Sequence, residues 1–260
     1  MTDIPTYRAH SIPDLLNLLP VLFGFKPQES LVGVCLDGDT RRFGFRLRID
    51  IPDESGDEDV SARVAALLEE NPGDAVILIA ITERKSRGEV LVQKTAEKME
   101  RKHVAVALCA SQSNWWEIGA EEAHPWRADP FHESIVRAVR EGQVIKADRV
   151  EIEREFAPSD EAIEYVQLER WQHSFAVPGE KTPPIGIDQR IEATTQTLDI
   201  LRRHQIPESS SIGDAVIALR NVLVRDHFWF TIDPENARNE LAVWAHLARR
   251  VRGPWRCAPL

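Results

Sequence analysis

The sequence predicts an α/β fold: a mixed sheet, made of an N-terminal antiparallel hairpin and parallel βαβ strands, followed by an all-helical C-terminal half. Apolar and polar residues alternate from Phe43 to Ile51, as expected for an antiparallel strand covered on one face. The runs Ala75–Ile81 and Val104–Ala110 are apolar throughout, which is typical of strands buried on both faces. Beyond about residue 130, apolar residues recur at the spacing of a helix face instead.

A short helix and a hairpin open the chain. Ser11–Asp14 has the pattern of a capping box, in which the serine hydroxyl accepts a bond from a free amide of the first helical turn. Pro20 is expected to kink or break this helix, and Gly24 suits its end because glycine adopts a positive φ at little cost. Leu31–Leu36 is predicted as a strand, and Asp37-Gly38 is a turn signal that joins it to the alternating strand.

The two apolar runs form the parallel part of the predicted sheet. The helical segment Ser86–Lys102 lies between them, and a strand–helix–strand unit of this kind joins parallel strands through a right-handed crossover. We therefore predict a first domain of mixed α/β structure over residues 1–128.

Residues 129–260 are predicted as a helical region. The proline- and glycine-containing stretch Ala176–Ile187 is the best candidate for a linker within it. The apolar end after Cys257 has no helix terminator, so we expect the natural chain to continue in further helices. The predicted helices are Pro130–Glu141, Asp160–Phe175, Ile187–His204, Ser211–Val224 and Glu235–Val251.

Composition and charge exclude several classes of protein. The 260 residues hold 32 Lys and Arg against 42 Asp and Glu, a net charge of −10, which makes the chain a poor binder of nucleic acid and of anionic membranes. Its longest apolar run is far shorter than the roughly 18 residues of a membrane helix, and residues 1–13 lack the apolar core of a signal peptide. Three scattered cysteines fit a reducing compartment, so we expect a cytoplasmic protein.

No strong catalytic or cofactor motif is present. The sequence lacks the glycine-rich phosphate loop, the dinucleotide fingerprint, the nucleophile elbow, the HExxH and CxxC metal motifs and the calcium-binding loop. We therefore predict no cofactor and no metal, assign no catalytic residue, and leave open whether the protein is an enzyme.

The polar face of the hairpin is the first candidate ligand site. Arg46 and Arg48 are two residues apart on a strand, so both side chains point to one face, where they could hold a phosphate or carboxylate through paired hydrogen bonds. Asp50 continues this row, and Ser30 lies nearby in the sequence. The alternative is an ordinary solvated sheet face on which Arg48 and Asp50 pair with each other.

Two adjacent tryptophans form the second candidate ligand site. Trp115 and Trp116 follow the second buried strand, and ligands of open α/β sheets bind beyond the carboxyl ends of parallel strands. There the rings could stack on a planar ligand. The alternative is that they pack between the sheet and the helical region, since tryptophan buries a large area.

A basic cluster near the C-terminus is a candidate partner surface. It could bind an acidic protein, with Arg249, Arg250 and Arg252 as contacts, or more weakly DNA. The alternative is that Arg249 and Arg250 complement the negative end of a helix dipole or pair with the acidic loop near residue 57. The cluster comprises Arg238, Arg249, Arg250, Arg252 and Arg256, against Glu240 alone.

Two further candidates are interpreted as structural. His124 and His132 lie among carboxylates, but Pro125 and Pro130 break the regular spacing that a set of three or four metal ligands needs. Cys109 lies in an apolar strand, where burial raises the pKa of a thiol and makes it inert. The carboxylates near the histidines are Glu121, Glu122, Asp129 and Glu133.

A series of short motifs runs along nearly the whole chain. They are Ser11–Leu16, Leu19-Pro20, Gly24–Pro27, Glu29–Val32, Leu47–Pro52, Trp115-Trp116, Asp129-Pro130, Gly142, Glu155–Pro158, Leu241–Trp244, Leu247–Arg250 and Gly253–Trp255. In these motifs the chain resembles an actinobacterial family known as domain of unknown function 4192. The resemblance implies a bacterial cytoplasmic protein with an α/β part and a helical part, and it implies no activity. Many members carry a cysteine-rich stretch where this chain has Glu117–Glu122 without cysteine, so no metal or redox role is expected there.

These observations favour a non-enzymatic binding, regulatory or scaffold protein. The α/β part would be the stable platform, and the helical half would face a protein partner or a second copy of the chain. The alternative is a small-molecule sensor or an enzyme that binds an anionic, planar ligand beyond the parallel strands.

Overall fold

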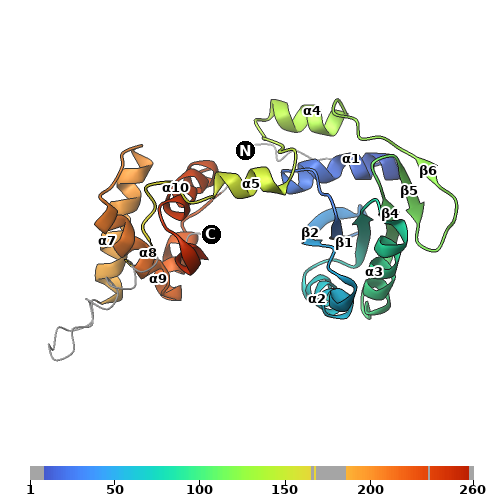
Figure 1. The fold of residues 1–260 in the computed structure, drawn as a ribbon, viewed down its shortest axis with the longest axis horizontal. Coiled ribbons are helices and arrows are strands. Elements are labelled where there is room, and N and C mark those ends of the chain that lie inside the picture. Colours follow the sequence, from blue (N-terminus) through green and yellow to red (C-terminus); the bar gives the residue numbers. More distant parts are fainter. Residues whose placement is uncertain (1–8, 165–166, 168–185, 234, 258–260) are drawn as a thin grey trace. The chain divides into compact units, whose positions relative to one another are not determined.

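The computed structural model describes residues 9–164, 167, 186–233 and 235–257, whose fold is drawn in Figure 1. They belong to two units, Met1–Glu151 and Ile152–Leu260, each with a hydrophobic core of its own. The fold class predicted from the sequence, a mixed sheet followed by a helical part, is confirmed. A domain boundary after residue 128 stays a prediction.

Among the described residues, a six-stranded sheet forms the centre of the first unit, in the order β2-β1-β3-β4-β5-β6. Its strands are β1 (Ser30–Asp37), β2 (Arg42–Asp50), β3 (Ala75–Ile81), β4 (His103–Ala110), β5 (Asn114–Glu117) and β6 (His124–Pro125). Strand β1 is antiparallel to β2 and to β3, whereas β3 and β4 are parallel, which confirms the predicted hairpin and βαβ unit. The short strands β5 and β6 were not predicted, and β5 contains Trp115 and Trp116.

Helices cover both faces of this sheet (Figure 1). The helices of the first unit are α1 (Ile12–Phe23), α2 (Asp57–Glu70), α3 (Lys85–Glu97) and α4 (Glu133–Arg140), with the 3-10 turn η1 (Glu54–Gly56), and α5 (Arg149–Glu155) begins at its end. On one face, Leu15 of α1 shares a core with Val32 of β1. On the other face, Leu68 of α2 and Leu91 of α3 share a core with Leu31 of β1. Successive residues of β1 are therefore buried under different helices.

Helix α1 begins at the predicted cap and ends at the predicted glycine. The amide of Asp14 donates to Ser11 Oγ over 3.2 Å, and Gly24 takes a φ of 76° with its amide bonded to the Pro20 carbonyl. A break of the helix at Pro20 is a wrong expectation, because α1 continues to Phe23. Proline removes a single amide donor, and this one lies within the last turn, so little of the helical hydrogen bonding is lost.

The second unit is helical. Its described helices are α7 (Ile187–Arg202), α8 (Ser209–Leu219), α9 (Val222–Trp229) and α10 (Ala237–Arg249), followed by the 3-10 turn η2 (Gly253–Cys257). The prediction of one helix over Ser211–Val224 is wrong, since α8 ends before Asn221 and α9 begins after it. Asn221 interrupts the helix because its side chain accepts a 3.0 Å bond from the amide of Leu223 and so caps a new helix start.

The helix predicted from Asp160 does not begin there. Residues 160–164 form a turn and a bridge between Ile163 and Val251, in which the Ile163 amide donates to the Arg250 carbonyl. Apart from residue 167, the rest of this predicted helix lies outside the described residues, and so does most of the predicted linker Ala176–Ile187.

A buried ion pair joins α2 to α3. Arg87 donates through both terminal nitrogens to the carboxylate of Asp57, which is 4% exposed, and Lys94 Nζ lies 3.3 Å from one of its oxygens. The hydrogen bonds from Arg87 outweigh the opposing effect of burial and hold the pKa of Asp57 below its ordinary value.

The Asp57 carboxylate is expected to stabilise the fold at neutral pH and to lose this effect in acid. Because its pKa is lower in the folded state, its contribution is complete above the unfolded pKa and disappears as the pH falls through the folded pKa. Asp57→Asn should cost about 3 kcal/mol of unfolding free energy at about pH 7 and much less at about pH 2. Urea titration at both pH values measures this, with the exposed Asp59→Asn as the matched control. An equal loss at the two pH values would contradict the expectation.

Gly88 lets α3 lie directly against β3 and β4. A methyl group at this position would come within 2.8 Å of Cys109 Sγ and 2.9 Å of the Ala80 methyl carbon. Although alanine favours helices, we expect Gly88→Ala to lower the unfolding free energy by about 1–3 kcal/mol through overpacking. Urea titration measures the loss, and Gly44→Ala, whose methyl would meet its nearest neighbour at 3.5 Å, is the control. A stabilised Gly88→Ala protein would show that the contact is not tight.

Candidate functional site

The polar face of the hairpin forms a connected network at one end of β1 and β2. Ser30 is fully buried; its hydroxyl donates to the Gln28 carbonyl over 2.5 Å and accepts a 2.7 Å bond from Arg48 Nε. Arg48 Nη2 lies 2.6 Å from Asp50 Oδ1 and 3.3 Å from the Gln28 carbonyl. The structure brings Ser30, Arg48 and Asp50 together, and Arg48 pairs with Asp50, as the alternative of a solvated sheet face describes. A ligand-binding role of Ser30, Arg46, Arg48 and Asp50 stays a prediction.

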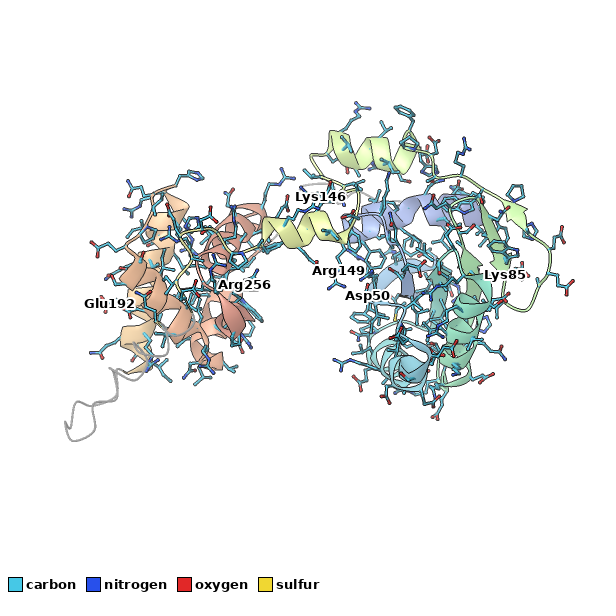
Figure 2. All side chains as sticks on the ribbon, in the orientation of Figure 1. Asp50, Lys85, Lys146, Arg149, Glu192 and Arg256 are labelled. Atoms are coloured by element: carbon cyan, nitrogen blue, oxygen red, sulfur yellow. The ribbon has the colours of Figure 1, made fainter. Side chains whose placement is uncertain are left out.

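The network continues to the end of the first unit. Asp50 Oδ2 accepts a 2.6 Å bond from Arg149 Nη1, and Figure 2 shows the two labelled side chains at the same corner. The Arg48 guanidinium also lies over the Phe25 ring, 5.8 Å from its centroid. With its side chain only 10% exposed, Arg48 directs its donors to groups of this chain, and the network joins the segment after α1 to the start of α5.

Arg46 has a different environment, although it lies on the same face of β2. Its Nε donates over 2.8 Å to the carbonyl of Leu22, in the last turn of α1, where helix carbonyls lack partners and the dipole is negative. Within the described part of the chain, neither terminal nitrogen of Arg46 has a hydrogen bond. The guanidinium is therefore held in place through Nε while two donors stay available.

An open groove of about 1540 Å³ lies along α1 on the same face of the sheet. Its apolar lining comes from α1 and from four neighbouring strands, β1 to β4. Sequence analysis did not identify this groove, because its walls come from segments far apart in the chain. Among the lining residues are Ile12, Leu15, Leu36, Phe43, Ile77 and Val106.

The charge at the groove is positive. Arg41, Arg42 and Arg46 line it, and no carboxylate is among the described residues that do so. Arg41 has a weak partner, since its Nη1 lies 3.6 Å from Asp74 in a pair whose two side chains are half exposed or more. The chain as a whole has a net charge of −10, so three lining arginines without a carboxylate make the groove a local exception.

Trp115 and Trp116 do not converge with the hairpin residues. As neighbours on a strand they point to opposite faces of the sheet. Trp115 belongs to the α1-side core and stacks on His124, with ring centroids 4.2 Å apart. Trp116 lies under Lys85, whose ammonium is 5.7 Å from the ring centroid. The two rings therefore cannot stack together on one ligand. A ligand-binding role for either ring stays a prediction.

The sheet edge beyond β3 contains a polar cluster of this chain's own residues. Thr82 Oγ1 donates to the carboxylate of Glu29 over 2.9 Å, and Arg84 Nη2 lies 2.9 Å from the same carboxylate. Burial acts to raise the pKa of Glu29, but the bonds from Arg84 and Thr82 outweigh it and hold the pKa below its ordinary value. Glu29 has a φ of 41°, a left-handed conformation that these bonds help to maintain.

The predicted partner arginines lie in the second unit. Arg250 is 8% exposed; it bonds to Glu161 over 3.1 Å and to Ser209 over 3.2 Å. Arg252 lies 3.1 Å from Glu164. These two side chains therefore bind residues of their own unit, and Arg249 is the exposed member of the predicted set. A partner contact at Arg249, Arg250 and Arg252 stays a prediction.

The histidines and Cys109 have structural surroundings. Across the described ranges, no group of three or more His, Cys, Asp or Glu residues could hold a metal ion. His132 caps α4 by accepting a 3.4 Å bond from the Ser134 amide, while its other ring nitrogen lies 3.4 Å from Asp14. Burial, followed by the nearby Glu89 carboxylate, raises the pKa of Cys109 to about 12, so the thiol is protonated at neutral pH.

Comparison with models of protein families identifies a family for nearly the whole chain. A family model described as "Domain of unknown function (DUF4192)" matches residues 13–260. Neither the curated proteins nor the solved structures contain a match to the chain. Of the helices that the structure describes, none combines the length and apolar character needed to cross a membrane.

Removing the Arg48 guanidinium is expected to destabilise the first unit. Arg48→Gln would remove the bond that the buried Ser30 hydroxyl accepts and one of the two arginine contacts of Asp50, at a cost of about 1–3 kcal/mol of unfolding free energy. Arg42→Gln is the matched control, because Arg42 lies on the same strand and is exposed. Urea titration compares the two variants. Equal stability of Arg48→Gln and Arg42→Gln would show that the network is not stabilising.

Proposed function

Because the chain belongs to the DUF4192 family, whose function is unknown, we propose a function from its own groove: the first unit is a non-enzymatic binding module for a partner that is apolar and negatively charged. The observation that carries the proposal is the position of Arg46 beside the groove. Its Nε is bound to the end of α1, and its two terminal nitrogens have no hydrogen bond to the described residues.

The apolar side chains of the groove would supply most of the affinity for a partner, and the arginines would orient it. Partly exposed side chains such as Ile12, Phe43 and Val106 favour an apolar occupant, since burying apolar surface contributes roughly 25 cal/mol per Å². Arginine adds orientation, because its planar guanidinium matches a carboxylate or phosphate through two parallel bonds. Holding the guanidinium in advance through the Leu22 carbonyl reduces the entropy lost when a partner binds.

The polar groups beside the groove form hydrogen bonds that stabilise the fold, which supports a role in binding rather than in catalysis. The Ser11 hydroxyl caps α1, and Gln143 donates over 2.6 Å to the Val21 carbonyl. The second unit would add Arg249, exposed at the end of α10, as a further contact for a protein partner. We place this function in the cytoplasm, a setting that the two free buried thiols Cys35 and Cys109 fit.

An apolar anion is expected to bind in the groove. Titration of the full chain with the dye anilinonaphthalene sulfonate, followed by methyl NMR, should shift the methyl signals of Ile12, Leu22 and Val106, which line the groove and are partly exposed. Arg46→Glu should weaken dye binding about tenfold, equal to about 1.4 kcal/mol, by replacing attraction with repulsion.

Arg63→Glu provides the matched control for this titration. Arg63 is exposed on α2, which covers the opposite face of the sheet, so this charge reversal should leave dye binding unchanged. Dye shifts located elsewhere in the chain, or equal effects of the two charge reversals, would refute the proposed site.

A further inference from the structure

We propose that the partner segment held by the groove is an acidic amphipathic helix of another protein, lying alongside α1. The inference rests on the proposed function and adds the conformation and charge of the occupant. Four observations support it: the size of the groove, the direction of its floor, the arrangement of helices on the sheet and the charge of its lining.

The groove is larger than a typical small-molecule site. Its volume is about 1540 Å³, whereas pockets for drug-sized ligands occupy roughly 300–1,000 Å³. A helix of about ten residues is about 15 Å long and 10 Å across, which corresponds to about 1,200 Å³. Lining residues on α1 extend from Ile12 to Leu22, a rise of about 15 Å along that helix. The length and volume of the groove therefore match a helix of about three turns.

The floor of the groove excludes an extended peptide. Leu36, Phe43, Ile77 and Val106 come from four adjacent strands, so the floor is the face of the sheet and not its edge. Leu36 and Ile77 are buried, and Phe43 and Val106 supply the partly exposed apolar surface of this floor. The backbone groups of these strands are already paired with each other in the sheet. An extended occupant would have to bury amides and carbonyls without partners there, which costs free energy for each group. A helix satisfies its own backbone and presents only side chains to such a floor.

The two faces of the sheet differ in their number of helices. On one face α2 and α3 share a core with the strands, as Leu68 and Leu91 show. On the other face, α1 is the only helix of the described residues in the corresponding core, and α4 packs on α1 through Ala138. A second helix beside α1 would bury Ile12 and Leu22 at the usual helix spacing of roughly 8–10 Å.

The lining arginines specify the charge of that helix. Arg41, Arg42 and Arg46 approach the groove from the hairpin, and the described lining contains no carboxylate to oppose them. A helix with Glu or Asp four residues apart along one edge would present carboxylates to this rim while its apolar stripe faces the floor. Arg46 is the strongest of these contacts, because its two free donors can bind one carboxylate through both oxygens.

Selection from peptide libraries tests the proposal with the full chain as bait. One displayed library encodes helices of about twelve residues with leucine at i, i+3, i+4 and i+7 and glutamate along one edge. The second library has the same composition with a central proline, which prevents a continuous helix. Binders are expected from the first library only, and a selected peptide should gain helical circular dichroism when it binds.

Charge reversal identifies the site of binding. Arg46→Glu should weaken a selected peptide at least tenfold, and exchanging its glutamates for lysines should restore binding to this variant. Arg42→Glu repeats the test at a residue that caps no helix, in case loss of the Arg46–Leu22 bond loosens α1. Arg63→Glu on α2 should leave the affinity unchanged.

The outcomes separate this inference from the proposed function. Dye binding in the groove with no binders from the helix library, or with equal recovery from the proline library, overturns the helical occupant and leaves the binding module in place. Peptides that bind equally well to Arg46→Glu and Arg42→Glu overturn the assigned contact. Absence of both dye and peptide binding overturns the two proposals together.

Discussion

The central strands of the first unit have to be covered on both faces, and most other features of that unit follow from this requirement. Val32 and Val34 of β1 need apolar cover on one side, while Leu31 and Cys35 need it on the other. Such cover comes from helices, since a helix brings apolar side chains to the sheet without unpaired backbone. On one face, α2 and α3 cover the strands. On the other face, α1 is the helix of the described residues that packs on the strands. The groove lies beside α1 on the second face, where Phe43 and Val106 stay partly exposed.

Polar side chains form hydrogen bonds at the ends of the strands and of α1, where the apolar contacts stop. Arg48 and Ser30 satisfy each other at one end of the hairpin, and Arg46 binds a free carbonyl at the end of α1. Arg46 thus both binds the end of a helix and borders the groove. Asp50 and Arg149 extend the same polar row to the end of the unit, which explains why residues of several family-like motifs lie together in space. Phe25, Ser30, Arg48 and Asp50 of these motifs therefore have structural contacts in this network.

The sequence predicts helices and strands well where they depend on the pattern of neighbouring residues. It does not predict features that depend on contacts between residues far apart in the chain. The alternation from Phe45 to Ile51 and the apolar run Ala75–Ile81 correctly predict the hairpin and the parallel strands, because the spacing of apolar side chains follows the buried faces of a strand. The expectation that Phe43 shares the face of Phe45 is wrong, because the β1–β2 register shifts there and Phe43 packs on the α1 side. Asn221 was overlooked because its capping role competes with a continuous apolar pattern. Arg46 could be selected as a polar residue on a strand, but its bond to Leu22 depends on where α1 ends in space. The groove combines five elements and has no sequence signal of its own.

The strand order has a consequence for how the protein is made. After the hairpin of β1 and β2, each described strand joins a strand that precedes it in the chain: β3 pairs with β1, β4 with β3, β5 with β4 and β6 with β5. No strand among those described is inserted between two earlier ones. The sheet can therefore grow from one edge while the chain emerges from the ribosome. The β1–β2, β4–β5 and β5–β6 pairings close short loops, whereas β3 joins β1 across β2 and α2, and β4 joins β3 across α3. Buried apolar strands such as β3 would then find their neighbour already formed, which shortens the time during which they are open to aggregation.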